Sequence, residues 1–170
     1  MREIKLESGI EKIAVKNEND EIVCVLKINT ADSQITSRFA NLLDNVDALA
    51  NEISKESARL KEKYNDVDGS NTEYIIEISK FRVGYISKLI EEIDAIFGED
   101  TIKNAYHECY EINEDFMPDE DMLIEFIDSV MPIMGELFEM RFKRNTTKYN
   151  ATKRGKHTKT KDELIAEAKK

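Results

Sequence analysis

Apolar and polar residues alternate near the start of the chain, as they do in β-strands. Residues 10–17 (IEKIAVKN) and 21–28 (EIVCVLKI) are rich in the β-branched side chains that strands favour. A polar cluster at 17–20 separates them and predicts a β-hairpin. Because a lone hairpin is marginal in water, we expect its apolar face to pack on helices or its edge to pair with another chain.

A long segment with helical periodicity follows the hairpin. Asp32 or Ser33 is predicted to cap a helix that runs to about Tyr64. Apolar residues recur at spacings of four and three, which keeps them on one narrow stripe that Glu56 interrupts. Such a stripe favours a helical hairpin or an intersubunit coiled coil. Its members are Ile35, Phe39, Leu42, Val46, Leu49, Ile53 and Leu60.

A second helix is predicted at about 73–97, after a polar linker at 65–72. Its apolar face is broad, so we expect it to be the central core helix. Gly98 is placed as its C-cap, and Asp100 as the N-cap of a short helix over 101–111. The broad face consists of Ile75, Ile76, Ile78, Phe81, Tyr85, Ile86, Leu89, Ile90, Ile93, Ile96 and Phe97.

A last long helix is predicted at 120–143, where Asp119 opens it after a turn around Pro118. Its apolar positions are rich in Met and Phe. Pro132 lies inside this helix and cannot donate a backbone hydrogen bond. We therefore expect a kink or break near residues 128–131.

The chain ends in a basic segment. Residues 143–161 contain eight Lys or Arg and no acid, so they are predicted to be disordered when unbound. Thr160 and Glu163 form a capping box for a short helix at 161–169. The predicted fold is mainly α: a helical bundle with an N-terminal β-hairpin at 1–142, and a flexible basic C-terminal tail at 143–170.

Composition supports helices and an intracellular setting. Of the residues, 35% are charged, and only two are proline. The N-terminus has no apolar signal region, and no run approaches the roughly 20 apolar residues of a membrane helix. We therefore expect a cytoplasmic protein without membrane contact, in which Cys24 and Cys109 are free thiols.

Charge is distributed unevenly along the chain. Residues 1–142 carry 15 Lys/Arg against 32 Asp/Glu, a net −17, whereas residues 143–170 carry 10 against 3, a net +7. The basic tail could bind nucleic acid, or it could contact an acidic protein surface such as the chain's own body. The second reading is favoured because the acidic body repels phosphate. The candidate residues are Lys143, Arg144, Lys148, Lys153, Arg154 and Lys156.

The linker after the first long helix resembles a calcium-binding loop only in part. Four of its side chains have the ligand spacing of an EF-hand loop, but Gly69 comes two places too early and Glu73 occupies an apolar position. A solvated turn fits this segment better. The four side chains are Asp66, Asp68, Ser70 and Glu77.

No other cluster predicts catalysis. His107, Cys109 and Glu111 alternate on a helix, so they point to different sides and do not converge on a metal. The acidic pairs Glu91–Glu92 and Asp119–Asp121 have no phosphate loop, nucleophile or histidine beside them in the sequence. The prediction is a protein that is not an enzyme and has no cofactor and no metal.

The order of elements resembles that of the tail assembly chaperones of Firmicutes phages and prophages. The resemblance rests on the N-terminal hairpin with its KNENDEI turn, the long helix with its three/four stripe, the helical bundle and the basic tail. It covers about residues 4–145 and includes no catalytic motif. It implies an oligomeric protein that binds the helical tape measure protein and recruits tail tube subunits during assembly.

The resemblance also implies an apolar groove for the tape measure helix. Either the stripe of the first long helix or the Met/Phe-rich helix 122–142 could form it, because flexible Met side chains adapt to helical partners. Two other functions stay open: a nucleic-acid-associated regulatory protein acting through its tail, and a structural phage tail or virion component. The candidate partner-binding residues are Ile35, Phe39, Leu42, Val46, Leu49, Met131, Met134 and Phe138.

Overall fold

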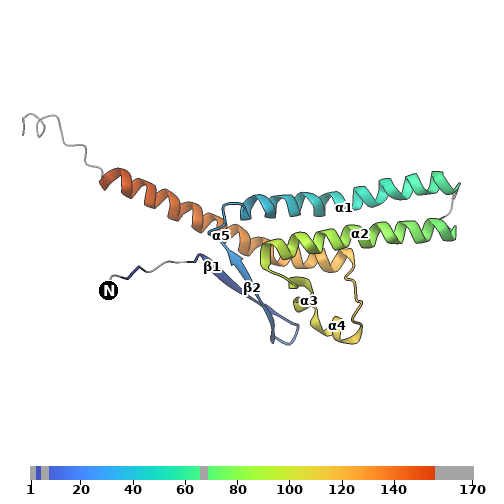
Figure 1. Ribbon diagram of the computed structural model, residues 1–170, viewed down its shortest axis with the longest axis horizontal. Coiled ribbons are helices and arrows are strands. Elements are labelled where there is room, and N and C mark those ends of the chain that lie inside the picture. The colour runs from blue at the N-terminus through green and yellow to red at the C-terminus, as the bar shows by residue number, and fades with distance from the viewer. Residues whose placement is uncertain (1–2, 5–7, 66–68, 156–170) are drawn as a thin grey trace, which may run out of the picture. The chain divides into compact units, whose positions relative to one another are not determined.

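The structure is a computed structural model that describes residues 3–4, 8–65 and 69–155 (Figure 1). The side chains of residues 145 and 148–155 are not among those described. The chain divides into two compact units, Met1–Ser129 and Val130–Lys170. The division falls inside the last helix, ahead of the point at which the composition turns basic.

The predicted hairpin is confirmed. Strands β1 (Ile10–Lys16) and β2 (Ile22–Asn29) pair antiparallel, with a register shift between Val15 and Lys16. Asn17 closes the turn, because its Oδ1 accepts hydrogen bonds from the backbone N–H groups of Asn19 and Glu21, both at 3.0 Å.

Two long helices follow, α1 (Ile35–Tyr64) and α2 (Thr72–Phe97), and they lie side by side (Figure 1). The expectation that Asp32 or Ser33 caps α1 is wrong, because Gln34 is the N-cap and makes no side-chain cap bond. Asp32 Oδ1 instead accepts from Gln34 N at 2.9 Å, one step before the helix. At α2, Asn71 Oδ1 accepts from Glu73 N at 2.9 Å, a regular N-cap.

The core of the first unit gathers around the second half of α2. Phe97 packs edge-to-face on Phe126, with ring centroids 5.8 Å apart. Strand β2 and helix α3 both contact α2 on this side. The buried aliphatic and aromatic residues of this unit are Leu26, Ile28, Ile35, Phe39, Leu42, Leu49, Leu60, Ile86, Leu89, Ile93, Ile96, Phe97, Ile102, Leu123, Phe126 and Ile127.

The first half of α2 does not belong to the core, contrary to the prediction of one broad buried face. Ile75 and Ile76 are 47% and 46% exposed. Ile78 and Phe81 are half-buried. Helix α1 contacts this half of α2, as at Ser57–Tyr74, but the described ion-pair and ring contacts of α2 with α5 begin at Arg82, which faces Glu120.

A short connection leads from α2 to the last helix. Gly98 ends α2 with φ +113°, as predicted for a C-cap glycine. The single helix predicted at 101–111 is instead two, α3 (Thr101–Ala105) and α4 (His107–Ile112). The break falls at Tyr106, whose hydroxyl donates to the carbonyl of Met122 at 2.8 Å. Asp100 stands before α3 but makes no side-chain cap bond.

Helix α5 (Glu120–Gly155) begins where it was predicted, with Asp119 Oδ1 accepting from Met122 N at 2.9 Å. Pro132 does not interrupt it. It also continues past the predicted end at 143, so that residues 143–155 belong to the helix. Thr146 and Thr147 direct their hydroxyls to carbonyls four residues back, which keeps these groups within the helix. The predicted helix at 161–169 lies outside the described residues.

Gly84 within α2 and Gly98 directly after it predict opposite effects of an alanine substitution on stability. Gly98→Ala places a side chain at φ +113° and should lower the free energy of unfolding by about 1 kcal/mol. Gly84→Ala should raise it by about 0.5–1 kcal/mol, because a Cβ there meets no atom within 4 Å. Urea denaturation of both variants checks this, and a stabilised Gly98→Ala protein would contradict it.

Candidate functional site

The candidate site is a shallow groove between α1 and α2 in the half of the helix pair that the core leaves uncovered. It has a volume of about 310 Å³. Aliphatic side chains from both helices line it, with hydroxyl groups between them. Its lining residues are Ala50, Ile53, Ser54 and Ser57 from α1 and Tyr74, Ile78, Ser79 and Arg82 from α2. We call this the distal groove.

A side-chain hydrogen bond ties the two walls of the distal groove together. Ser57 Oγ and Tyr74 Oη lie 2.8 Å apart, and either atom can be the donor. The Lys61 ammonium lies 5.9 Å from the centroid of the Tyr74 ring, a cation–π distance. Tyr74 of α2 thus contacts α1 through both its hydroxyl and its ring.

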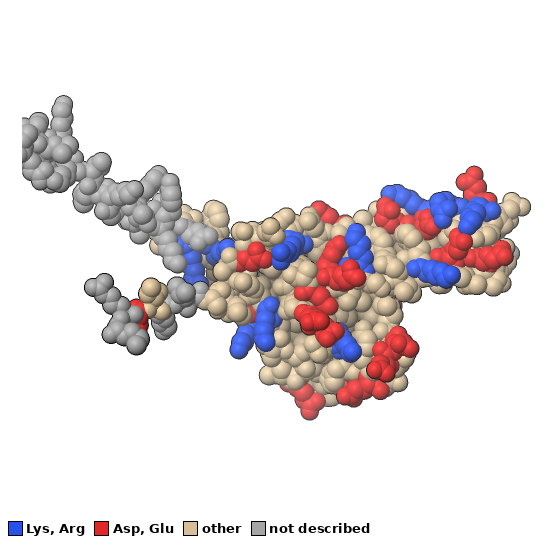
Figure 2. All heavy atoms as spheres, in the orientation of Figure 1, with Lys and Arg blue, Asp and Glu red and all other residues tan. Residues whose placement is uncertain are grey.

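Charged residues fasten the end of the helix pair. Lys63 Nζ lies 2.8 Å from Glu77 Oε1, and the Tyr64 hydroxyl donates to the same oxygen at 2.6 Å. The hydrogen bond from Lys63, followed by that from Tyr64, lowers the pKa of Glu77 below its ordinary value. Glu56 is paired with Arg59 in the same way, at 2.6 Å. Figure 2 accordingly shows acidic and basic side chains interspersed over this end of the pair.

The face of α2 that is buried in the core continues into solvent as an exposed strip, in which Ile75 is the apolar residue. The positions 75, 79, 82, 86, 89 and 93 follow each other at spacings of four and three, so they share one face of the helix. The last three are buried, whereas Ile75 is 47% exposed. Val83, also 47% exposed, lies beside this face. Arg82 marks the transition, with its guanidinium 3.8 Å from Glu120 Oε1.

The predicted stripe of α1 is placed mostly in the core. Ile35, Phe39, Leu42 and Leu49 are buried, and Val46 is half-buried. These five residues therefore offer a partner no open surface unless the unit rearranges. Only Ile53, farther along the same stripe, faces the distal groove.

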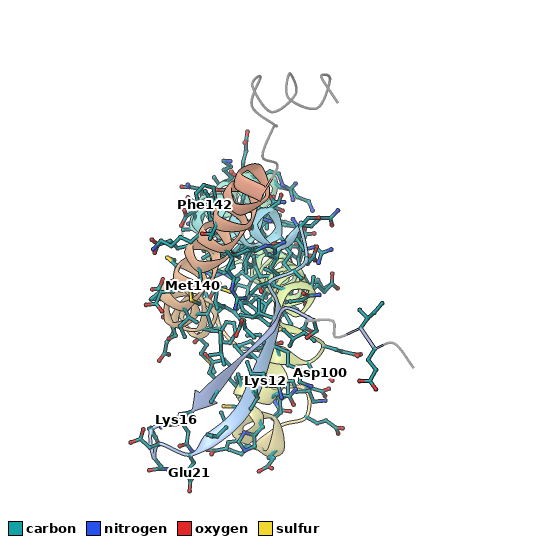
Figure 3. The ribbon with its side chains drawn as sticks, turned by 90° about the vertical axis from the view of Figure 1, so that its left-hand side faces the viewer. Lys12, Lys16, Glu21, Asp100, Met140 and Phe142 are labelled. Atoms are coloured by element: carbon teal, nitrogen blue, oxygen red, sulfur yellow. The ribbon has the colours of Figure 1, made fainter. Side chains whose placement is uncertain are left out.

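The predicted residues of α5 differ in exposure although they lie on one helix. Met134 is buried, Phe138 is half-buried and Met131 is exposed. Farther along, Met140 and Phe142 are also exposed, Phe142 to 73% (Figure 3). The second unit thus presents apolar side chains to solvent in addition to those that the sequence predicted.

The basic residues are helical as far as the structure describes them. Lys143 and Arg144 are exposed, and Lys143 Nζ lies 2.6 Å from Glu139 Oε1. The hydrogen bond from Lys143 lowers the pKa of Glu139. Lys148, Lys153 and Arg154 belong to the helix, but only their backbone is described. Lys156 lies outside the described residues.

Among the residues that the structure describes, no three His, Cys, Asp or Glu side chains come together as a metal site. Glu77, one of the four side chains of the calcium-like pattern, forms an ion pair with Lys63. Asp66 and Asp68 lie outside the described ranges. Cys24 and Cys109 are free thiols, and burial raises the pKa of Cys24. None of the described helices is long and apolar enough to span a membrane.

A second groove between α1 and α2, nearer the hairpin sheet, is occupied by the protein's own polar contacts. Asn45 Nδ2 donates to both carboxylate oxygens of Glu92 at 2.9 Å. Arg38 Nη1 lies 3.0 Å from Asp32. Because these groups already satisfy one another, the distal groove is the better candidate for binding.

Sequence reasoning missed the exposed residues Ile75, Ile76 and Val83 as binding candidates. The available signal was the pair Ser79 and Arg82, which interrupts the apolar face of α2 ahead of Ile86. A core face would not carry two polar residues at successive positions of its stripe.

Comparisons with known proteins add no relatives. No protein-family model, no curated protein and no solved structure matches the chain.

The pair Lys63–Glu77 predicts a pH-dependent stability of the helix pair. Because the pKa of Glu77 is lowered, its stabilisation is present above the ordinary carboxyl range and is lost as the pH falls through the lowered value. Glu77→Gln should lower the melting temperature at pH 7, and the difference from wild type should be smaller at pH 3, because protonation of Glu77 weakens the pair. The control Glu62→Gln, on the same end of α1, should show no difference from wild type at either pH.

Proposed function

We propose that this protein is a tail assembly chaperone-like protein that binds the tape measure protein and tail tube subunits while a phage tail is built. The single observation that carries the proposal is the distal groove with its exposed apolar strip. The resemblance in the order of elements supports it. No enzymatic activity is proposed.

The distal groove fits a helix better than it fits a small molecule. It is shallow and lies between the antiparallel helices α1 and α2, with aliphatic side chains on both walls. An amphipathic helix, about 10 Å across, binds such a groove through apolar residues spaced three and four apart. Ile53 and Ile78 offer apolar contact on the two walls, and Ile75 extends it along the strip.

The polar groups of the groove suit a partner that is bound and later released. Hydroxyls of Ser54, Ser57 and Ser79 lie among the aliphatic side chains, so the surface is not purely apolar. A mixed surface binds with moderate affinity, because polar groups cost desolvation energy. Moderate affinity matches an assembly factor that must leave its client.

The second unit supplies a further contact for a second partner. Met131, Met140 and Phe142 are exposed along α5 (Figure 3). Methionine adapts to irregular surfaces, and large exposed aromatics commonly mark binding sites. We assign tail tube subunits to this surface and the tape measure helix to the distal groove.

Co-expression with the tape measure protein of the same phage tests the proposal. Wild-type protein should keep the tape measure soluble and co-purify with it. Ile53→Asp/Ile78→Asp, which charges both walls of the distal groove, should lower the co-purified amount about tenfold or more, because burial of each aliphatic side chain is worth about 1.5–3 kcal/mol. Both residues are half-buried and not part of the buried core, and circular dichroism checks that the variant folds.

The matched control is Ile112→Asp, which charges an apolar side chain that is 89% exposed on α4, outside the groove. It should bind as wild type does. A soluble tape measure with the double variant would contradict the groove assignment. Abundance of the protein in purified particles would favour the structural virion component, and salt-sensitive co-purification of nucleic acid would favour the regulatory protein.

A further inference from the structure

Among the described residues, the hairpin sheet consists of β1 and β2, and no further strand pairs with the outer edge of β1. β2 is the strand that contacts α2 and α3. Gly9 O accepts from Thr30 N at 2.8 Å, so these two residues form a hydrogen-bonded pair. Bonded and non-bonded pairs alternate along an antiparallel ladder. The backbone N–H and C=O groups of Lys12 and Ala14 therefore point to the open edge.

Two observations agree with an outer edge of β1 whose backbone groups are unpaired. Ile10, whose N–H should also point outward, donates to Ser8 Oγ at 3.4 Å and not across to β2. Lys12 and Ala14 have exposed side chains, and no described residue outside the hairpin hydrogen-bonds to either of them. The edge is accessible for a further strand.

The apolar face of the hairpin is also incomplete on this side. Leu26 and Ile28 of β2 are buried, at 2% and 0% exposure. Ile13 and Val15, on the same face of β1, are only half-buried. A strand added beside β1 would cover both side chains with its own apolar residues.

The opposite face of β1 is positively charged. Lys12 and Lys16 are exposed along it (Figure 3). Lys12 forms no ion pair within the described part of the chain, and Lys16 has only a 3.5 Å contact with the exposed Asp20. A strand that fits this edge should therefore carry acids on one face and aliphatic residues on the other.

The chain's own N-terminal segment has that pattern. Residues 3–7 read Glu-Ile-Lys-Leu-Glu, with the two acids on one face and Ile4 and Leu6 on the other. Glu3 and Glu7 are four residues apart, as are Lys12 and Lys16. Ile4 is 86% exposed.

We propose that residues 3–7 of one copy add as a third strand to the open edge of β1 in a second copy. Because both charged pairs are four residues apart, Glu3 and Glu7 come opposite the two lysines in either strand direction. The same alignment brings Ile4 and Leu6 opposite Ile13 and Val15. Opposite charges and aliphatic pairs directly across a ladder both stabilise it.

Geometry excludes the same arrangement within one chain. Gly9 O also accepts from the Thr30 hydroxyl at 2.8 Å, so the chain follows β2 as far as Gly9. The tightest reversal before Ile10 uses residues 8 and 9 as the turn. It would place Lys5 opposite Lys12, like charge against like. The favourable alignment needs a partner copy.

Pairing of β1 with a second β1 is also disfavoured. The outward residues of β1 are Ile10, Lys12, Ala14 and Lys16, with no acid among them. Two such strands would bring four lysines together on one face, and repulsion between them opposes association. The inference concerns self-association only and does not depend on the proposed function.

Sedimentation velocity of charge-swap variants of the full chain tests the proposed strand addition between copies. Wild type should self-associate. Lys12→Glu/Lys16→Glu and Glu3→Lys/Glu7→Lys should each associate about tenfold more weakly or worse, because each replaces attractive pairs with repulsive ones. An equimolar mixture of the two should associate again. Residues 3–7 of each variant then meet a β1 edge of opposite charge in the other variant.

Lys80→Glu/Lys103→Glu is the control, because it changes the net charge equally at exposed positions on α2 and α3, away from the hairpin. It should associate as wild type does. Circular dichroism establishes that each variant is folded. A monomeric wild type, a mixture that stays dissociated, or a control as weak as the edge variant would each overturn the proposal.

Discussion

Burial of the second half of α2 is the interaction on which the first unit depends. Leu89 and Ile93 are fully buried, and α1, β2, α3 and the start of α5 all meet this one face. Each of these elements has too little apolar surface to be stable alone. The hairpin in particular contributes Leu26 and Ile28, which are buried only because the helices are present.

The same arrangement explains why a groove exists. Helix α2 has 26 residues and α1 has 30, so the pair is longer than the elements that cover it. In the uncovered half, the buried Leu60 is accompanied by polar contacts between the helices, the Ser57–Tyr74 hydrogen bond and the Lys63–Glu77 ion pair. Aliphatic side chains that would be core elsewhere therefore remain available to a partner.

The open features of the chain are of two kinds. The distal groove presents side chains and fits a helix, whereas the edge of β1 presents backbone groups and fits a strand. They lie on different elements, so the proposed helical partner and the proposed second copy would not compete for the same residues.

The sequence by itself determined the kind and order of the elements. Alternation marked the hairpin, three/four spacing marked α1 and α2, and Gly98 and Asp119 marked helix ends, because these signals act over a few neighbouring residues. Local signals were less reliable where tertiary contacts compete, as at Tyr106, whose bond to Met122 accompanies the break between α3 and α4. Helix α5 likewise passes Pro132 and continues through the start of the basic segment.

Only the tertiary structure decided which apolar stripe is core and which is surface. Ile35, Phe39 and Leu42 became core, while Ile75 and Val83, equally apolar in sequence, stayed exposed. Periodicity shows that a helix has an apolar face, but it does not show whether another element is long enough to cover it. That depends on the lengths and packing of segments distant in the chain, and so the candidate site could not be located from the sequence.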